Sequence, residues 1–587
     1  MDGLSLYGRV LRQAKLTPNN IAVQHAEGTI TYDGLIKKAD AYARYLLRSR
    51  MGPNNVVCML MERSIDMIAC TIGVLQAGGA YMQLNRAMPG DMMHELFRSL
   101  DPVIIVDEAF EALIAHPMKI LSNDIIESIM ESGGVASMPV SIERSSDQLA
   151  YLVYTTGTSG KQKVIMAEDR NIIHYIDRYT EIFDITQDDR SLQQSPCYYD
   201  RFSEEVFSML FNGGTIILPQ DSELLNPRLI KKVIARYGVT IMGITPLMLS
   251  AINSEASDGM ESMRYFISTG DVLKLRQYNN LVKHTRIINM YGPSETTVCA
   301  TYYECKGDEE DSVPVGKPLG GYDIMICDEG RKEIEGGKQG EIYIGGIGIT
   351  RGYWMDGDVK SNGFIELFGK RMFKTNDIGY WRSDGNLEFC GRKDRQIKIH
   401  GRIVNIDDIE KVLSNQPMVK GVAIFDKEFN DDRLIMAFYI SDAGDIAREL
   451  RKYAKERLAG YMVPGKFIRV DAFPLTGTGK LDKKALLLME SETKTERQED
   501  VGQWGDSFFQ EFAGKLSEYV SLKQGHINIY PDTELDDIGI DSIEFISLVV
   551  FIESAYGFKF DDNMLDNNVY QTAADLCRYI QSKEKSE

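Results

Sequence analysis

The sequence predicts a large α/β N-terminal domain of layered sheets and helices, followed by a smaller α+β segment and an all-α helical unit. Three observations predict this order. Strand-like apolar runs alternate with amphipathic helical stretches up to about Gly391, which is typical of mainly parallel α/β layers. The same mixture recurs on a smaller scale in residues 394–490. Beyond residue 503, apolar positions recur only at helical spacing.

The elements of the N-terminal domain follow from continuous apolar runs. Residues 55–61 (NVVCMLM) and 149–155 (LAYLVYT) are predicted to be buried strands. Residues 64–79 (SIDMIACTIGVLQAGG) follow the first of these strands and are predicted to form a helix. A strand followed by a helix is the repeating unit of a parallel sheet.

The C-terminal third has its own strands and helices. Residues 419–425 and 433–440 are predicted to be strands, and residues 443–458 a helix. The charged segment SETKTERQEDVGQ (491–503) has almost no large apolar residue, as is typical of a linker. The predicted helices of the last unit are residues 504–522, 542–557 and 573–585. The predicted domains are therefore residues 1–393, 394–490 and 504–587, with the linker at 491–503.

Composition limits the possible classes of function. A chain of 587 residues is too long for one hydrophobic core. Its formal net charge of −20 argues against nonspecific nucleic-acid binding and fits a protein with acidic docking surfaces. No apolar stretch is long enough to span a bilayer, and the N-terminus does not resemble a secretory signal. We therefore expect a cytoplasmic protein without a membrane partner.

The eight cysteines are scattered along the chain, without a C-x-x-C pair or a nearby histidine partner. Neither a disulfide framework nor a zinc site is therefore predicted. We expect these thiols to be buried as small apolar groups.

The strongest local signal is a loop rich in glycine and hydroxyl groups, directly after the predicted strand 149–155. It comprises Thr155, Thr156, Gly157, Thr158, Ser159, Gly160 and Lys161, with Lys163 close by. Backbone N–H groups in such a loop can surround a polyphosphate. The G-x-x-x-x-G-K-[ST] spacing is absent, so this is not a P-loop of the usual kind. Taken alone, the segment could equally be an ordinary turn.

Companion motifs occur in order along residues 1–488. They are 30–35 (ITYDGL), 75–81 (LQAGGAY), 289–297 (NMYGPSETT), 340–346 (GEIYIGG), 373–377 (FKTND), 391–398 (GRKDRQIK) and 474–480 (PLTGTGK). Together with the loop they resemble the adenylate-forming superfamily, which includes acyl-CoA ligases, luciferases and the adenylation domains of nonribosomal peptide synthetases. The resemblance implies an enzyme that uses ATP and Mg²⁺ to join a carboxylate to AMP, with release of pyrophosphate.

The resemblance also assigns roles in the first reaction. Lys480 would bridge the substrate carboxylate and the nucleotide, and Glu295 would help to hold Mg²⁺. Without the resemblance, Lys480 would be a solvated surface group and Glu295 a turn cap. Tyr291 would stack on adenine, Asn289 would contact its edge and Asp377 would accept hydrogen bonds from the ribose hydroxyls. The other implied nucleotide-binding residues are Gly270, Ser294 and Arg392.

A second reaction would move the acyl group to a thiol. In the family, the smaller subdomain rotates about a hinge that corresponds to Asp394. The rotation would withdraw Lys480 and bring Lys398 to the site. Asp394 is otherwise a simple turn residue. The resemblance thus implies that residues 394–490 form a mobile subdomain.

Asp200 is the residue that favours an amino acid as substrate. In the family, an aspartate at this position meets the α-ammonium group, a charge-assisted pair that a fatty acid cannot form. In an ordinary acidic loop Asp200 would be solvated. The other implied pocket residues are Arg201, Glu204, Gly243, Ile267, Thr269, Met290, Val298 and Cys299.

Arg201 is unusual at its position, and two interpretations of the pocket stay open. Glu204 could meet a cationic side chain of the substrate, or it could pair with Arg201 and shape the cavity. Gly243 and Thr269 leave room for a sizeable side chain, which favours a large polar or basic amino acid.

The helical unit resembles a peptidyl carrier domain. The segment DIGIDSI (537–543) matches the attachment site for 4′-phosphopantetheine, with Ser542 as the attachment residue at the start of a helix. A serine there would also serve as a helix N-cap. The resemblance implies a phosphopantetheinyl transferase, a downstream condensation or tailoring enzyme and a small activator protein as partners.

Several positions depart from the family pattern. Gln162 stands for a proline, Val164 for a glycine and Asn376 for the glycine before the ribose aspartate. Arg402-Ile403 replaces an aromatic–arginine pair, which leaves the phosphate contacts open. The alternatives are an acyl-CoA ligase of the same fold and a scaffold protein with a decayed site. Asp200 argues against the first, and the retained Lys480 against the second.

Overall fold

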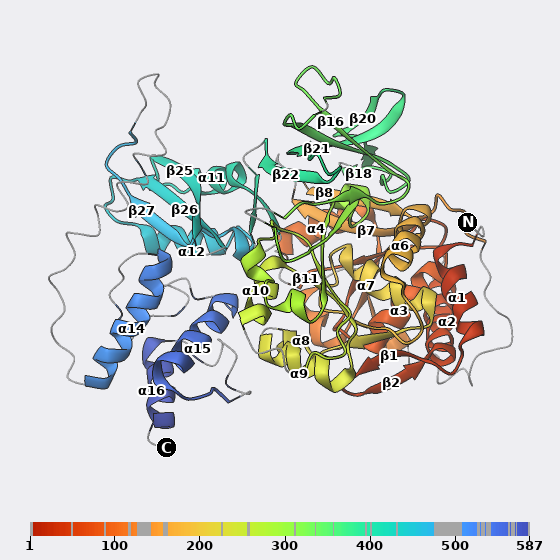
Figure 1. Ribbon diagram of the computed structural model, residues 1–587, viewed down its shortest axis with the longest axis horizontal. Helices are drawn as coiled ribbons and strands as arrows, with labels where there is room; N and C mark the ends of the chain where they lie inside the picture. The colour runs from red at the N-terminus through yellow and green to blue at the C-terminus, as the bar shows by residue number, and fades with distance from the viewer. Residues whose placement is uncertain are drawn as a thin grey trace. The chain divides into compact units, whose positions relative to one another are not determined.

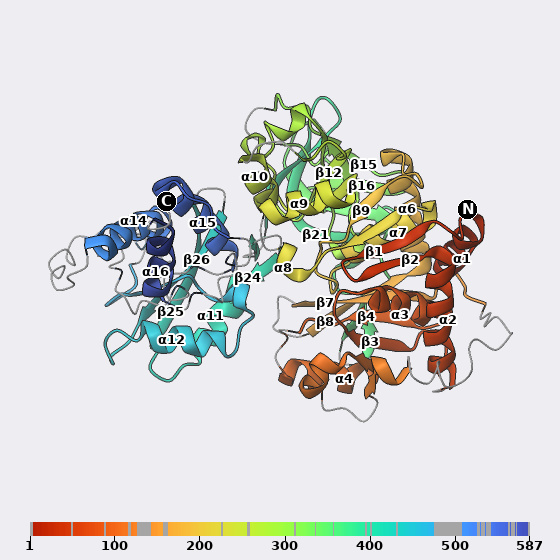
Figure 2. The same cartoon turned by 90° about the horizontal axis from the view of Figure 1, so that it is seen from below.

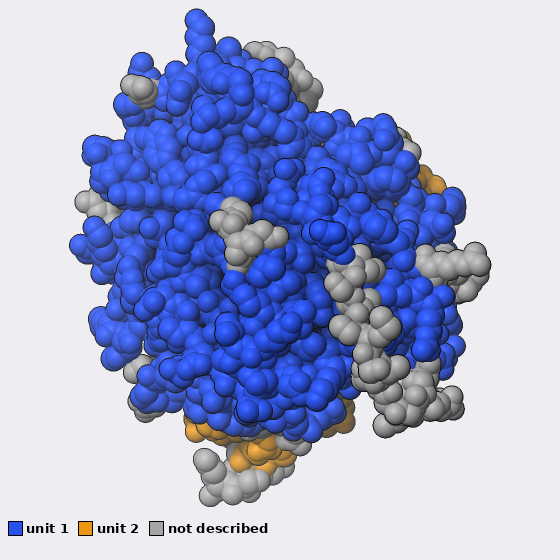
Figure 3. All heavy atoms as spheres, turned by 90° about the vertical axis from the view of Figure 1, so that its right-hand side faces the viewer, with its two compact units in different colours: residues 1–224, 230–394 blue, residues 225–229, 395–587 orange. Residues whose placement is uncertain are grey.

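The structure is a computed structural model that describes residues 4–48, 51–86, 88, 90–114, 119–125, 143–156, 162–224, 227–254, 259–309, 313–334, 336–355, 357–393, 396–399, 402–429, 432–474, 486, 507–524, 529, 535, 540, 542–561, 564, 570 and 572–584. It divides into two compact units, coloured separately in Figure 3. The first comprises residues 1–224 and 230–394, and the second residues 225–229 and 395–587.

The first unit contains two large sheets (Figures 1 and 2). One has the strand order β19 (Asp358–Lys360), β18 (Tyr353–Met355), β8 (Gln162–Glu168), β7 (Leu149–Thr156), β4 (Ala80–Gln83), β3 (Val56–Leu60), β5 (Val103–Val106) and β6 (Lys119–Leu121). The other has the order β15 (Lys317–Pro318), β14 (Thr301–Glu304), β13 (Arg286–Tyr291), β12 (Tyr265–Ser268), β11 (Ile241–Ile244), β9 (Arg190–Leu192), β10 (Thr215–Leu218), β1 (Ile21–His25) and β2 (Gly28–Thr31). In the first of these sheets, the neighbouring strands from β7 through β4, β3 and β5 to β6 are parallel. In the second, the neighbouring strands from β1 through β10, β9, β11 and β12 to β13 are parallel.

A third sheet of this unit is antiparallel. Its strands are β16 (Tyr322–Cys327), β17 (Gly340–Gly346), β21 (Lys370–Trp381), β20 (Phe364–Leu367) and β22 (Leu387–Arg392). The helices of the unit are α1 (Leu6–Leu16), α2 (Tyr32–Arg48), α3 (Ile65–Gln76), α4 (Gly90–Leu100), α6 (Asp169–Phe183), α7 (Arg201–Asn212), α8 (Asp221–Leu224), α9 (Pro227–Tyr237) and α10 (Pro246–Ser254).

The alternate residues of β3 pack into two different hydrophobic clusters, one on each face of the sheet. In β3, Val57 and Met59 belong to the main core, whereas Cys58 and Leu60 pack in a separate cluster with Leu96 of α4. Successive side chains of a strand point to opposite faces, so helices cover both faces of this sheet. Helix α3 contacts β4 and β1, one strand from each large sheet, and therefore lies between the sheets (Figure 2). The predicted α/β fold class is confirmed.

Helix α3 shows how closely the sequence predicts a buried element. It spans Ile65–Gln76 inside the predicted range 64–79 and begins after the N-cap Ser64, whose side chain accepts a hydrogen bond from the Met67 amide. Residues Met67 to Gln76 are all buried. A helix that is apolar all round is expected in the interior of a large domain.

The second unit holds the smaller α+β segment and the helical unit. β25 (Gly421–Phe429), β26 (Asp432–Ile440) and β27 (Lys466–Arg469) form a sheet, with α11 (Ile406–Ser414) and α12 (Ala447–Lys455) packed in the core of one face. β23 (Gln396–Ile399) and β24 (Arg402–Asn405) form a hairpin. The predicted helix 443–458 starts late, at Ala447, because Asp445 accepts hydrogen bonds from the Ala447 amide and the Tyr439 hydroxyl.

The last helices form a separate core, as the sequence predicts. They are α14 (Ser507–Gln524), α15 (Ser542–Tyr556) and α16 (Ala573–Glu584). Their core includes Phe512, Leu516, Phe545, Leu548 and Ile580. Among the residues that the structure describes, no helix combines the length and the apolar character that crossing a bilayer requires.

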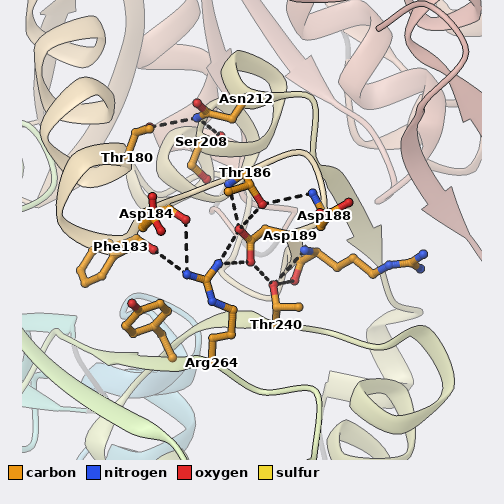
Figure 4. A network of polar contacts seen from close by, with 12 residues as sticks. Thr180, Phe183, Asp184, Thr186, Asp188, Asp189, Ser208, Asn212, Thr240 and Arg264 are labelled. Carbon is orange, nitrogen blue, oxygen red and sulfur yellow. Dashed lines mark hydrogen bonds and ion pairs between the residues drawn. The ribbon is translucent and has the colours of Figure 1, made fainter.

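A buried carboxylate joins three segments near the start of β9 (Figure 4). Asp189 accepts hydrogen bonds from Arg264 at 2.6 Å, from the Thr240 hydroxyl at 2.8 Å and from the Thr186 amide at 2.9 Å. The Asp189 side chain is 2% exposed, and that of Arg264 is 35% exposed. This network stabilises the amino-terminal edge of the parallel strands on which the site depends.

We expect Asp189→Ala to destabilise the first unit by about 3 kcal/mol, because Thr186 and Thr240 lose a shared acceptor and Arg264 loses its counterion. For a unit of this size the loss corresponds to about 4 °C in the unfolding midpoint, measured by calorimetry. Asp188→Ala is the matched control, because Asp188 is exposed beside it. Equal midpoints for the two variants would contradict the assigned role.

Candidate functional site

The predicted pocket residues meet at one edge of the second large sheet. Gly243, Ile267 and Met290 are each the penultimate residue of a parallel strand, in β11, β12 and β13. Gly243 pairs directly with Ile267. Helix α7, which begins at Arg201, follows β9 of the same sheet. Open α/β sheets bind ligands at the carboxyl ends of their strands, so this edge is the expected place for a site.

Asp200 immediately precedes α7, and one of its carboxylate oxygens is buried. Its Oδ2 atom finds no hydrogen-bond partner among the described residues. Burial raises the pKa of this carboxyl group, and a hydrogen bond from the Ser294 side chain opposes that shift. A buried, unpaired carboxylate oxygen is costly unless a ligand group reaches it. A cationic donor is the group that would satisfy it best.

Arg201 reaches across the ends of two strands. Its Nη2 atom donates to the carbonyl oxygen of Ile267 at 2.5 Å, and its Nη1 atom donates to the Thr269 hydroxyl at 3.0 Å. A Cβ atom on Gly243 would collide with the guanidinium group. The expectation that Gly243 leaves room for a sizeable substrate side chain is therefore wrong, because Arg201 occupies that room.

Glu204 pairs with Arg201, one turn earlier on α7. The Arg201 Nε and Glu204 Oε1 atoms lie 3.5 Å apart, and the Glu204 side chain is 1% exposed. The other Glu204 oxygen accepts a hydrogen bond from the Tyr175 hydroxyl. Burial raises the pKa of Glu204, and the charge of Arg201 opposes this shift. Of the two interpretations of these residues, the structure supports the internal ion pair.

Glu205 also lies at this end of α7 but is held by polar neighbours. It accepts hydrogen bonds from the Ser195 hydroxyl at 2.7 Å and from the Gln193 side-chain amide at 2.8 Å. Burial raises its pKa to about 7. Glu205 is not among the residues that the family resemblance implies for the pocket.

The backbone beside the pocket is strained. Thr297 and Val298 have φ angles of 63° and 62°, in the left-handed region that β-branched residues avoid. Such conformations cost roughly 1–3 kcal/mol each and concentrate at functional sites. Cys299 follows directly and is buried, and burial raises the pKa of its thiol above the usual range. The strained turn brings Val298 and Cys299 from the 289–299 segment to the pocket.

The predicted nucleotide residues Tyr291, Asp377 and Arg392 come together. The Tyr291 hydroxyl donates to Asp377 Oδ2 at 2.6 Å, and Arg392 Nη1 donates to Asp377 Oδ1 at 2.8 Å. Asp377 and Arg392 are opposite each other on β21 and β22. The carboxylate predicted to meet the ribose therefore lies beside the predicted adenine-stacking tyrosine and the predicted nucleotide-binding arginine.

Asn289 connects β13 to the segment that contains Pro314. Its side-chain amide donates to the backbone carbonyl oxygen of Pro314 at 2.9 Å, and the residue is buried. Asn376, which departs from the family glycine, has a φ angle of 61°. Asparagine is among the few residues other than glycine that tolerate this region, which explains the replacement.

Glu295 is a half-buried carboxylate close to Lys163. It accepts a hydrogen bond from the Tyr353 hydroxyl at 2.5 Å, and Lys163 Nζ lies 5.2 Å from the centre of the Tyr353 ring. Burial raises the pKa of Glu295, and the hydrogen bond and Lys163 oppose this shift. Carboxylate oxygen is a ligand that Mg²⁺ prefers, so Glu295 is suited to an ion that arrives with ATP.

The predicted phosphate loop lies between two strands that pair in antiparallel fashion. Thr155 pairs with Lys163, and Thr156 pairs with Gln162, across β7 and β8. Gly270, which follows β12, has a φ angle of 94° that favours glycine. The predicted residues Gly157, Thr158, Ser159, Gly160, Lys161, Asp394 and Lys480 lie outside the described residues, as do the side chains of Thr155, Thr156, Lys398 and Ser542.

Tyr175 and Tyr353 hold Glu204 and Glu295, and no motif of the sequence points to either tyrosine. Each lies on a different element from its partner, far away in the chain. No local spacing pattern could have identified either tyrosine.

Comparison with known families matches three parts of the chain. Residues 10–354 match the AMP-binding enzymes, and residues 408–480 match the C-terminal domain of these enzymes. Residues 520–580 match the phosphopantetheine attachment site. The last of these ranges includes Ser542, and the second includes Lys480.

Two relatives illustrate the range of lengths. Bacitracin synthase 2 of Bacillus licheniformis is 31% identical over 580 residues, which cover 98% of this chain and 22% of that protein. Zwittermicin A synthase ZmaJ of Bacillus cereus is 31% identical over 498 residues, 82% of this chain and 94% of that protein. This chain thus spans about a fifth of the first relative.

A solved structure has a similar fold. It is that of holo-PA1221, an NRPS protein containing adenylation and PCP domains, with a TM-score of 0.81 and 23% sequence identity. The match covers 98% of this chain and 96% of that one.

Proposed function

This chain belongs to the family of AMP-binding enzymes, and from that premise we propose that it activates an amino acid as an aminoacyl-AMP. It combines this adenylation unit with a phosphopantetheine attachment domain. The activated amino acid is then transferred to the thiol of 4′-phosphopantetheine on Ser542. Loading of this kind is the first step of nonribosomal peptide synthesis.

The unpaired Oδ2 atom of Asp200 is the observation that carries the choice of an amino acid. An α-ammonium group supplies the cationic donor that this buried carboxylate lacks. A simple carboxylic acid has no such group and leaves the oxygen unsatisfied. The acyl-CoA ligase alternative is therefore disfavoured.

In the first reaction, a carboxylate oxygen of the amino acid attacks the α-phosphorus of ATP, and pyrophosphate leaves. Asp377 and Tyr291 would hold the nucleoside, Glu295 would hold Mg²⁺ bound to the phosphates, and Lys480 would neutralise the two anions as they meet. In the second reaction, the thiol sulfur attacks the acyl carbon, its proton is lost to solvent, and AMP leaves.

The domain arrangement follows from this division of labour. We assign an adenylation core to residues 1–393, a mobile subdomain to residues 394–490, a linker to residues 491–503 and the carrier to residues 504–587. Asp394 would be the hinge. The partners would be a phosphopantetheinyl transferase, a downstream condensation or tailoring enzyme and a small activator protein. We propose a cytoplasmic location, where ATP and coenzyme A are available.

ATP–pyrophosphate exchange over a panel of amino acids and simple carboxylic acids tests the proposal. We expect one or a few amino acids to stimulate exchange. A response to carboxylic acids without an amino group would instead identify an acyl ligase. Silence in the presence of every substrate and of a co-expressed activator would support the decayed scaffold.

Asp200→Asn should lower kcat/KM for the amino acid in this assay by about 100- to 1000-fold. Asparagine keeps nearly the same shape as aspartate but removes the negative charge that would pair with the α-ammonium group. ATP affinity, measured by calorimetry, should stay unchanged. Asp188→Ala is the control for an exposed aspartate. If Asp200→Asn retained wild-type kcat/KM, its assignment to the ammonium group would be wrong.

A further inference from the structure

The pocket beyond Asp200 contains one donor atom and one acceptor atom that form an ion pair with each other but no hydrogen bond with any described residue. Arg201 Nε and Glu204 Oε1 have no hydrogen-bond partner within the described part of the chain, although they lie 3.5 Å apart. Both side chains are at least nine-tenths buried. An unsatisfied buried polar atom destabilises the fold, so two adjacent ones indicate a place for a ligand group.

The remaining atoms of both residues are fixed by other partners. The Nη atoms of Arg201 are held by the Ile267 carbonyl and the Thr269 hydroxyl, and Glu204 Oε2 is held by the Tyr175 hydroxyl. These contacts orient the two side chains before any substrate binds. The unsatisfied atoms are therefore preorganised.

A single group can satisfy both atoms. A hydroxyl group accepts one hydrogen bond and donates another, and a carboxamide does so with its oxygen and nitrogen. With hydrogen bonds of about 2.7–3.0 Å, either group spans two atoms 3.5 Å apart. A carboxylate offers no donor, and an ammonium group offers no acceptor.

Charge balance also disfavours an anionic side chain. The positive charge of Arg201 is compensated by Glu204, and Asp200 faces the α-ammonium group in the proposed function. Glu205 is a further buried carboxylate, held by Ser195 and Gln193. A carboxylate side chain would enter this buried site without a counterion. The guanidinium group also fills the room next to Gly243, which favours a short side chain.

We propose that the enzyme selects a short amino acid whose side chain ends in a hydroxyl or carboxamide group, which bridges Arg201 Nε and Glu204 Oε1. This inference rests on the proposed function and names its substrate class. It replaces the sequence-based preference for a large polar or basic side chain.

Pyrophosphate exchange by the full chain with paired amino acids tests the inference. The pairs are threonine with valine, serine with alanine, and asparagine with leucine, together with aspartate, lysine and ornithine. The best substrate should carry a hydroxyl or carboxamide and should exceed its apolar partner in kcat/KM by on the order of 100-fold. An apolar or charged best substrate would overturn this inference alone. Silence with every amino acid would overturn the proposed function and this inference with it.

Arg201→Ala gives an independent test. The variant leaves the charge of Glu204 uncompensated, so the ratio of lysine or ornithine exchange to hydroxyl or carboxamide exchange should rise at least about 10-fold. Arg201→Lys keeps the positive charge and should still exclude basic amino acids. Arg286→Ala, in an exposed ion pair with Glu304, is the control for loss of an arginine. An unchanged substrate profile in Arg201→Ala would overturn the proposal, and the wild-type panel decides it if this variant does not fold.

Discussion

Ser542→Ala should abolish loading of the carrier while leaving pyrophosphate exchange at the wild-type level. Alanine lacks the hydroxyl oxygen that would form the phosphodiester bond to 4′-phosphopantetheine. Ser542 is the first residue of α15, in the segment that matches the phosphopantetheine attachment site. Alanine is a good helix former, so we expect the helical core to persist.

The measurement is the intact mass after incubation with a phosphopantetheinyl transferase and coenzyme A, followed by ATP and the amino acid. Wild-type protein should gain the pantetheine arm and then the aminoacyl group. Ser547→Ala is the matched control, because Ser547 is exposed on the same helix. If Ser542 were only a helix cap, its loss would cost about 1 kcal/mol of stability and leave loading intact. That outcome would contradict the carrier assignment.

Lys480→Ala should abolish formation of the adenylate. The attacking carboxylate and the α-phosphate are both anions, and their approach needs a cation placed between them. Lys480 lies in the segment that matches the C-terminal domain of AMP-binding enzymes. Pyrophosphate exchange is the measurement, and Lys370→Ala, a change to an exposed lysine paired with Asp323, is the control. Normal exchange in Lys480→Ala would rule out this role.

Lys398→Ala should have the complementary effect. Lys398 lies on the β23–β24 hairpin, opposite Ile403, and the proposed rotation would bring it to the site for the second reaction. Exchange should stay near wild type, and the rate of carrier loading should fall. Equal loss of both steps would count against a hinge at Asp394.

Much of the fold could be predicted because buried strands and helices appear in the sequence as continuous apolar runs. The apolar run 55–61 contains β3, and the range 64–79 contains α3, since both elements are buried on all sides. The helix boundary at Ala447 could not be predicted, because it depends on the contact between Asp445 and Tyr439 of a neighbouring strand.

The candidate site divides in the same way. The sequence by itself determined the order of elements, the motif residues and the acidic character of Asp200, because these are properties of short segments. Only the tertiary structure decided that Arg201 pairs with Glu204, that it fills the space at Gly243, and that Asn289 bonds to Pro314. The physical reason is that a side chain's partners are set by strand register and helix packing, which join segments far apart in the chain. This pairing leaves Arg201 Nε and Glu204 Oε1 without a hydrogen-bond partner among the described residues. The proposed substrate class could therefore be inferred only from the folded chain.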